Sequence, residues 1–259
     1  MLKRIGFAAL PAVALLSLGF ATAGATEAPV FPAPTAVAPT AAPAIPVVSA
    51  VSAPVEPAPA AAAPAHQHSD QPSAAPGQHF ADYQAWLARS PANRDSVRAF
   101  RSYLAAQGLA DVIPVWQLIR TSSSWRGCGA DRFEVAPRDK WDNIVTTLKF
   151  VRDEVRPAVG EVEALSVYRN ETLNRCSNGA PASAHRLFFA LDLKPVSEDV
   201  SRAGMISRVC RAHAARGSSY NAGLGFYSGL RFHVDSHGYR KWGADGRGAS
   251  SPCATGNYA

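Results

Sequence analysis

Apolar residues recur at helical spacing between positions 80 and 160. The stretch 80–121 predicts three short helical pieces, the third of which contains Pro114. A stronger pattern follows, in which apolar side chains are three or four residues apart: Trp141, Ile144, Val145, Leu148, Val151 and Val155. Pro157 and Gly160 are expected to end this helix. Each stripe is interpreted as the side of a helix that faces the core.

Beyond position 160 the spacing of apolar residues changes from helical to alternating. The expected strands are 162–168, 188–193 and the two arms of a hairpin over 223–235. The expected helices among them are 170–176 and 201–216. Helices first, then strands with helices between them, predict an α+β fold. We expect a mainly antiparallel sheet that carries the functional site, flanked by helices and preceded by an N-terminal helical extension.

The last expected strand has two different faces. Because side chains alternate along a strand, its apolar positions share one face, namely Leu230, Phe232 and Val234. Its polar positions share the opposite face, namely Arg231, His233 and Asp235. The apolar face is interpreted as core. The polar face brings an imidazole and a carboxylate to one surface.

Composition divides the chain into three parts. Residues 1–25 resemble a secretory signal peptide, because two basic residues precede a short apolar run and small residues follow it. An uncleaved membrane anchor is the alternative, but the run is shorter than the about 20 residues of a spanning helix and contains Pro11. Residues 26–78, rich in Pro and Ala, predict a disordered linker. Residues 79–259 then form one domain.

Charge and cysteines narrow the class of protein. The formal net charge of +6 is mild and lacks the dense Lys/Arg runs typical of nucleic-acid binding. An exported chain with four cysteines predicts two disulfides, with three possible pairings. We favour Cys128–Cys176 and Cys210–Cys253. A catalytic cysteine is the alternative.

Candidate chemistry begins with a carboxylate inside an apolar strand. Asp192 is the lone charged residue within 188–193, and a buried carboxylate must be paired or bind a metal. His185 lies seven residues before it and His233 lies on a separate strand. Two imidazoles and a carboxylate would leave one position on a zinc ion open for water, as in catalytic sites. Alternatively, His185 caps a turn, Asp192 pairs with an arginine and His233 is a surface residue.

Several motifs around these residues resemble a known family. They are Ser166-Val-Tyr-Arg-Asn170, Asn174, Gly179-Ala-Pro-Ala-Ser-Ala-His185, Ala190-Leu-Asp192 and Gly225-Phe-Tyr followed by Phe-His-Val-Asp235 and Trp242. The chain thereby resembles the zinc D-alanyl-D-alanine carboxypeptidases, peptidoglycan metallopeptidases of the group that also holds lysostaphin-type and hedgehog-like domains. The resemblance covers residues 128–242, which we take as the core of the domain.

The resemblance implies a role for each matching residue. Zinc would be bound by His185, Asp192 and His233. Arg169 and Ser183 would hold the substrate peptide or its carboxylate, which an arginine can grip in two places. The alternatives are that Arg169 pairs with a carboxylate at a helix end and that Ser183 caps the turn before His185.

One position departs from the family pattern. Relatives carry Glu or Asp as general base three residues before the last zinc histidine, and here Leu230 stands there. Asp235, the nearest carboxylate on the metal-facing side, is assigned this role, although it could instead orient a metal ligand through a hydrogen bond. His237 is the other catalytic candidate, as a proton donor or oxyanion stabiliser.

These expectations combine into two functional hypotheses. The first is a periplasmic or secreted zinc metallopeptidase that hydrolyses peptide bonds in peptidoglycan stem peptides or crosslinks, as carboxypeptidase or endopeptidase. The second is a catalytically silent domain that binds peptidoglycan and retains the peptidase fold. In both, the partners are peptidoglycan peptides rather than nucleic acid, and the mature chain is expected to be monomeric and without a membrane span.

Overall fold

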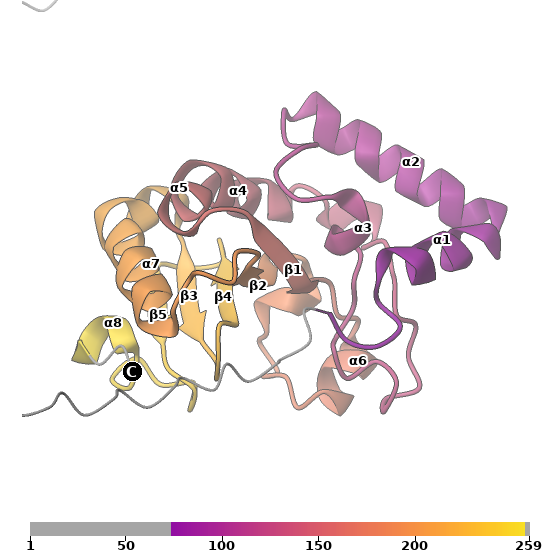
Figure 1. Ribbon diagram of the computed structural model, residues 1–259. Coiled ribbons are helices and arrows are strands. Elements are labelled where there is room, and N and C mark those ends of the chain that lie inside the picture. The colour runs from indigo at the N-terminus through magenta and orange to yellow at the C-terminus, as the bar shows by residue number, and fades with distance from the viewer. Residues whose placement is uncertain (1–73, 257–259) are drawn as a thin grey trace, which may run out of the picture. The chain divides into compact units, whose positions relative to one another are not determined.

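The N-terminal part of the domain is helical, as its apolar spacing predicts. In a computed structural model, which describes residues 74–256, the first helices are α1 (Phe80–Ala88), α2 (Pro91–Ala106) and α3 (Val115–Leu118) (Figure 1). The Ser90 side chain accepts a hydrogen bond from the Ala92 N–H and Pro91 opens α2, so this helix begins with both a cap and a proline. The signal peptide and residues 26–73 of the predicted linker lie outside the described residues.

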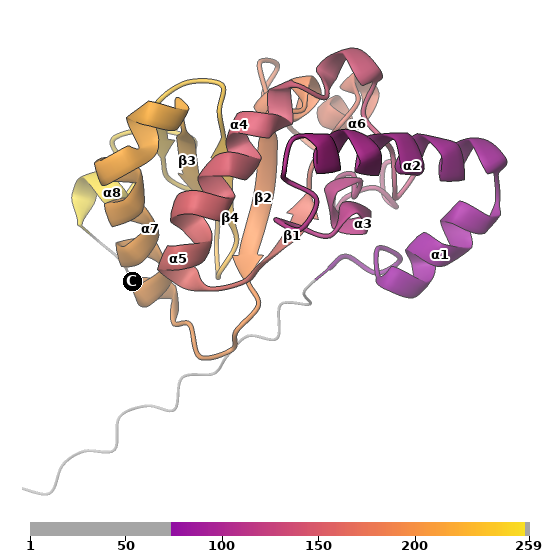
Figure 2. The same ribbon diagram turned by 90° about the horizontal axis from the view of Figure 1, so that it is seen from above.

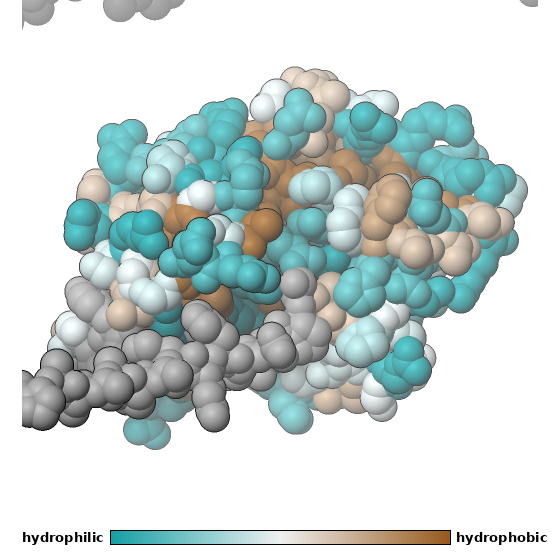
Figure 3. Space-filling view, in the orientation of Figure 1, coloured by the Kyte–Doolittle hydropathy of each residue, from teal (hydrophilic) through white to brown (hydrophobic). Residues whose placement is uncertain are grey.

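The helical extension is joined to the rest of the domain through its apolar side. Trp86, Phe100 and Leu104 are buried and belong to the same core cluster as the sheet. On the outside, Figure 3 shows apolar surface beside α2 and α3, where Phe80 and Trp116 help to line a groove. The extension therefore shares one core with the sheet and also presents an apolar groove.

The long amphipathic helix is confirmed, but only one of the two residues expected to terminate it does so. The short 3-10 helix η1 (Arg138–Lys140) leads into α4 (Asn143–Phe150), which continues through a π-helical turn, η2 (Val151–Val155), into α5 (Arg156–Val159). Pro157 therefore lies inside the helical stretch instead of ending it. The π turn accommodates the proline, because the Arg156 N–H bonds to the Val151 carbonyl five residues back and the backbone widens there. Gly160, at φ 80°, ends the helix.

The second half of the described chain forms a sheet with five strands. These are β1 (Val162–Ser166), β2 (Ala190–Pro195), β3 (Gly223–Phe226), β4 (Phe232–Asp235) and β5 (Arg240–Trp242). Their spatial order is β1-β2-β4-β3-β5, and each neighbouring pair is antiparallel except β3 with β5. The α+β fold with a mainly antiparallel sheet is confirmed.

Helices cover one face of this sheet. Leu191, Leu224 and Val234 lie side by side on β2, β3 and β4 and are fully buried. They share the core cluster with α4 and with α7 (Arg202–Arg216), and Figure 2 shows these helices along one side of the sheet. The opposite face, which carries the polar alternating positions, is left for the candidate site.

Short elements connect the strands and shape the edges of the site. They are α6 (Glu171–Cys176), η3 (Ala184–Leu187), η4 (Gly217–Tyr220) and α8 (Pro252–Thr255). Asn170 caps α6, since its side chain accepts from the Leu173 N–H. The strand expected from residue 188 starts later. Phe188 has φ 62° and ends η3 in the left-handed conformation, so β2 begins only at Ala190.

Both favoured disulfides are present. Cys128 is bonded to Cys176, with their Cα atoms 5.8 Å apart, and Cys210 to Cys253, with 5.3 Å. The first ties α6 to the loop before η1, and the second ties α8 and the C-terminal tail to α7. Disulfides are typical of exported proteins. Within residues 74–256, none of the helices has both the length and the hydropathy needed to cross a bilayer.

The packed part of the chain starts before the expected domain boundary at residue 79. Gln78, which the sequence placed in the linker, is fully buried, and Ala74 is 1 % exposed. The Gln78 side-chain amide donates to the Arg132 carbonyl at 2.8 Å, and Arg120 Nε donates to the Gln78 carbonyl at 2.9 Å. Residues 74–78 therefore belong to the folded domain.

Candidate metal centre

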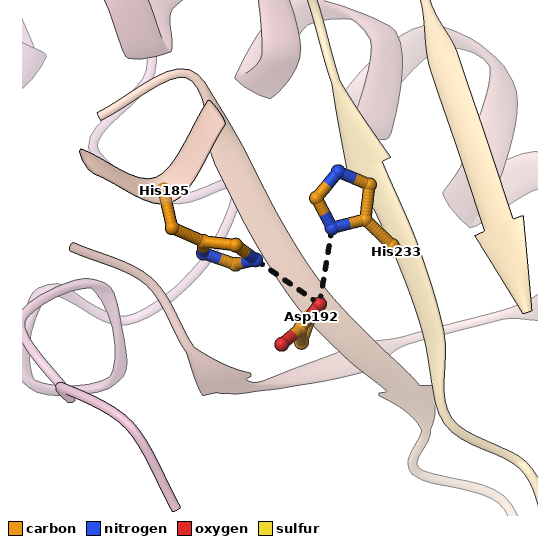
Figure 4. A group of neighbouring side chains, drawn as sticks. All are labelled: His185, Asp192 and His233. Atoms are coloured by element: carbon orange, nitrogen blue, oxygen red, sulfur yellow. Dashed lines mark hydrogen bonds and ion pairs between the residues drawn. The ribbon is translucent and has the colours of Figure 1, made fainter. Parts of the chain in front are cut away.

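Three predicted ligands converge from three elements on the polar face of the sheet. His185 comes from η3, Asp192 from β2 and His233 from β4, and their side chains point toward one another (Figure 4). Asp192 and His233 are directly opposite in the β2–β4 register. Their potential ligand atoms, together with that of His185, all lie within 4.8 Å of one another, and all three residues are buried. This buried cluster could hold a metal ion.

The remaining nitrogen of each imidazole is occupied by an acceptor. His185 Nδ1 lies 2.6 Å from the Val167 carbonyl oxygen, to which it can only donate. His233 Nε2 lies 2.8 Å from Asp235 Oδ2. His185 Nε2 and His233 Nδ1 are thus the nitrogens turned toward Asp192. Outer partners of this kind are what fixes the tautomer and orientation of metal-binding histidines.

Burial and neighbouring charges set the protonation of the cluster. Burial and the Arg169 charge lower the pKa of His185 to about 4, so this imidazole is neutral at pH 7 and has a free lone pair. Burial opposes ionisation of Asp192, but the Arg231 charge and the hydrogen bond from His233 outweigh it and hold the pKa of this carboxyl well below its usual range. Burial lowers the pKa of His233, yet hydrogen bonds to Asp192 and Asp235 raise it overall. A metal would therefore compete with a proton at His233.

The two oxygens of Asp192 have different neighbours. Oδ1 lies 3.2 Å from His185 Nε2 and 3.1 Å from His233 Nδ1, and it accepts a hydrogen bond from the Tyr227 hydroxyl at 3.0 Å. Oδ2 accepts from Arg231 Nη2 at 2.7 Å and from Arg169 Nη2 at 3.3 Å. Asp192 therefore pairs with arginines, as the alternative interpretation expected, and at the same time faces the two histidines.

Sequence reasoning missed Arg231 and Tyr227 as site residues. The alternation of the last strand had placed Arg231 on the face of His233, which was the available signal. Tyr227 was part of a quoted motif but was given no role. Only the approach of β3 and β4 to β2 brings both residues to Asp192.

Two glycines on β3 hollow out the polar face. Gly225 is opposite both His233 and Trp242, and a Cβ atom on Gly225 would collide with the Trp242 ring. With no Cβ there, Trp242 packs with its ring centroid 5.3 Å from that of His233. Gly223 likewise leaves space for the Asp235 carboxylate. The absence of side chains at alternate positions is what allows a buried polar layer over this strand.

The structure gives Asp235 several partners of its own. Besides His233, its carboxylate accepts hydrogen bonds from the Arg240 guanidinium at 2.8 and 3.0 Å and from the His237 backbone N–H at 2.7 Å. Burial opposes ionisation, but the contacts with His233 and Arg240 outweigh it and lower the pKa of Asp235 to about 2. These contacts favour the orienting role over that of general base, because a carboxylate of such low pKa is a weak proton acceptor.

Of the other predicted site residues, some lie at the histidine–aspartate cluster and others do not. Arg169 is buried and reaches Asp192, so it lies at the cluster. Ser183 precedes η3 and its side chain does not cap that helix. His237 is exposed and packs its ring on Phe189, with centroids 4.8 Å apart. Leu230, three residues before His233, packs against the core.

Comparison with known proteins finds no matching family model, no matching curated protein and no matching solved structure. The functional argument therefore depends on the site itself. Two imidazole nitrogens and one ionised carboxylate oxygen, each held by further hydrogen bonds, form a donor set that could hold a divalent metal.

Proposed function

We propose that this protein is an exported zinc-dependent peptidase that hydrolyses peptide bonds in peptidoglycan stem peptides or crosslinks. The observation that carries the proposal is the buried convergence of His185, Asp192 and His233. Three protein ligands of this chemistry are typical of catalytic zinc, whereas structural zinc sites take four. The motif resemblance around the same residues supports peptide hydrolysis as the reaction.

When bound, zinc would lower the pKa of a water molecule and polarise the scissile carbonyl. The chain would supply the rest. Val167 and Asp235 hold the two imidazoles in the required tautomers. The Tyr227 hydroxyl donates to the ligand carboxylate and holds it in place. Arg169 has N–H donors that Asp192 does not occupy, and these would stabilise negative charge on the substrate. Such fixed donors also orient the substrate before the reaction.

Export is supported by separate observations. The N-terminal pattern of a signal peptide and the two disulfides of the domain agree on an oxidising compartment. We place the protein in the periplasm or outside the cell, where peptidoglycan is its accessible polymer. A mild positive charge favours this anionic material, and we expect a monomer.

The test combines metal content with product analysis. Purified protein should contain about one zinc per chain and cleave isolated muropeptides, as seen by mass spectrometry. His185→Ala should lose both properties. His213→Gln is the matched control, since His213 is a buried histidine of α7 whose Nε2 donates to the Ala222 carbonyl away from the cluster. Intact muropeptides with stoichiometric zinc would contradict the enzymatic proposal.

A second candidate function is a silent peptidoglycan-binding domain. It is favoured by Leu230 at the usual position of the base and by the four hydrogen bonds that already engage Asp235. Native protein and Asp235→Ala should be compared for hydrolysis and for sedimentation with peptidoglycan. Hydrolysis that depends on Asp235 supports the enzyme, and binding without hydrolysis supports the binding domain.

A further inference from the structure

The helical extension carries a groove that shares none of its lining residues with the candidate metal centre. The lining comes from α1, α2 and residues 110–116, at the start of α3. The groove encloses about 730 Å³, and ligand sites commonly enclose about 300–1,000 Å³. Figure 3 shows that apolar surface is open to solvent in this region. This part of the domain thus has room for a ligand of its own.

Three aromatic side chains line this groove. The centroid of the Phe80 ring lies 5.9 Å from that of Tyr83 and 5.6 Å from that of Trp116. Phe80 is 50 % exposed, so half of its apolar surface is available to a ligand. The buried Arg120 stacks on Trp116, with its guanidinium carbon 4.4 Å from the ring centroid, and holds this ring from one side. The groove therefore presents a preformed aromatic surface.

Two polar atoms on these rings have no acceptor within residues 74–256. The indole N–H groups of Trp125 and Trp141 donate to backbone carbonyls at 3.2 and 2.8 Å. That of Trp116 finds no such acceptor in the described part of the chain, and neither does the Tyr83 hydroxyl. Aromatic side chains with an unused N–H or O–H suit a ligand that is apolar but offers carbonyl oxygens.

The charged residues of the groove are mainly basic. Arg94, Arg98 and Arg101, here called the α2 arginines, lie on the same side of α2 at spacings of four and three residues. Asp111 is the one acid among the residues that line the groove. Arg98 pairs with Asp95 at 3.5 Å, but both side chains are exposed and such a pair is weak. The groove should therefore attract a ligand with an acidic group.

We propose that this groove binds an extended, proline-rich segment of a partner protein, with an acidic residue next to the prolines. Proline favours the polyproline II conformation, which has no internal hydrogen bonds, so its carbonyl oxygens are free to accept from Tyr83 and Trp116. Proline rings pack on aromatic side chains, and a backbone that is already restricted loses little entropy on binding. The acidic residue would face the α2 arginines. The inference goes beyond the peptidase proposal and does not depend on it.

The amino-acid sequence itself supplies a peptide of this chemistry. Ala-Pro-Val-Glu-Pro-Ala-Pro stands at residues 53–59, and the same heptad with phenylalanine in place of glutamate stands at residues 28–34. A synthetic, end-blocked copy of the first, the Glu heptad, combines closely spaced prolines with one carboxylate. It can be added to the full chain as a probe for the groove.

The experiment compares three peptides by calorimetric titration into the full chain. They are the Glu heptad, the same peptide with Gln in place of Glu, and a version with alanine at every proline. The Glu heptad should bind about threefold more tightly than the Gln peptide, because it gains the attraction of the α2 arginines. The alanine version should bind at least about tenfold more weakly than the Glu heptad, because it lacks both the rings and the restricted backbone.

Variants of the protein locate the bound peptide. Phe80→Ala removes an exposed ring of the groove and should weaken the Glu heptad by about tenfold. Tyr83→Phe removes only the hydroxyl, should weaken binding by about threefold, and serves if Phe80→Ala does not fold. Arg98→Gln combined with Arg101→Gln should reduce the preference for the Glu heptad over the Gln peptide to below about 1.5-fold.

Two matched controls lie outside the groove. Tyr239→Ala removes a ring that is also 50 % exposed. Arg175→Gln removes a charge from an exposed ion pair with Glu171. Both variants should bind the Glu heptad as the native chain does.

Several results would overturn the proposal. Binding that survives both Phe80→Ala and Tyr83→Phe unchanged would place the peptide elsewhere, and equal affinity for the Glu heptad and its alanine version would exclude proline recognition. The other possible occupants are tested with a chain in which alanine replaces the prolines of both heptads. If this chain binds the Glu heptad at least about threefold more tightly than the native chain, the groove is occupied by the protein's own N-terminal segment. A dimer that is lost in Phe80→Ala would instead assign the groove to a second copy. Absence of peptide binding by both chains also contradicts the proposal, whereas equal binding by both supports it.

Discussion

The two faces of the central sheet are built from the same strands but differ in what burial requires of them. On β2, Leu191 and Asp192 are neighbours, both are fully buried, and they point to opposite faces. Leu191 packs among apolar side chains, and the removal of its side chain from water stabilises the folded state. Asp192 loses its hydration and is stable only because two guanidinium groups and the Tyr227 hydroxyl donate to it.

The apolar face of the sheet thus stabilises the fold, whereas the polar face carries the candidate site. An apolar row needs only shape complementarity, so many sequences could fill it. The polar layer needs each charge to have a partner, so its members depend on one another. Such a mutually dependent, buried polar layer on one face of a sheet is therefore a stronger indication of chemistry than the apolar stripes were.

The largest effect is expected from Asp192→Ala. The substitution leaves Arg169 and Arg231 without their carboxylate, and loss of one partner of a buried pair costs about 3–5 kcal/mol of unfolding free energy. Zinc binding should be lost as well. Denaturant unfolding and metal analysis measure the two effects. An Asp192→Ala protein that keeps stoichiometric zinc would show that the cluster is not the metal site.

Leu191→Ala tests the neighbouring position on the other face. Truncation of a buried leucine costs about 2–5 kcal/mol through lost burial and the cavity that remains. Zinc per folded chain should stay at the native value, because the ligands are on the opposite face. Loss of zinc from folded Leu191→Ala would mean that the two faces are not independent.

The pH dependence of stability should separate the two histidines. The pKa of His185 is lowered from 6.5 to about 4. The contribution of His185 to the free energy of unfolding is therefore complete above about pH 6.5 and is lost as the pH falls to about 4. The full depression corresponds to about 3 kcal/mol. His233 has a raised pKa and the opposite sign, since its contribution is complete below about pH 6.5 and is lost at higher pH.

Metal-free native protein and His185→Asn should therefore be unfolded with urea at several pH values. The variant should lose less unfolding free energy than the native protein between pH 6.5 and 4.5. An equal pH dependence in both proteins would exclude His185 as the source. His213→Asn should also lose part of the pH dependence, because burial lowers the pKa of His213 as well, so this variant is a comparison outside the cluster.

A smaller effect is expected from Asp235→Asn. The amide oxygen can still accept from His233 Nε2, but it no longer favours the orientation and basicity of that ligand, so zinc affinity should fall by about 10–100-fold. At saturating zinc, hydrolysis should largely recover if Asp235 only orients His233. If Asp235 is the general base, kcat should stay low at every zinc concentration. Zinc titration followed by kinetics decides between the two roles.

Much of the local structure could be predicted from residue spacing. The face of α7, the strand alternation of β4 and the cap of α6 all follow from neighbours in the sequence. The errors were also local in origin. Pro157 and Phe188 break simple rules, because a π turn accommodates the one and a left-handed turn uses the other. Both conformations depend on packing that a single stretch of sequence does not contain.

The candidate site divides in the same way. His185, Asp192 and His233 were recognisable from the sequence, since a lone carboxylate in an apolar strand needs partners and two histidines of suitable context were available. The sequence by itself also determined the alternation that directs each side chain to its face. The tertiary structure decided which oxygen of Asp192 meets the histidines and which meets Arg169 and Arg231. Those contacts join residues 23 and 39 positions apart, and only strand register and the glycines of β3 bring such distant groups within bonding distance.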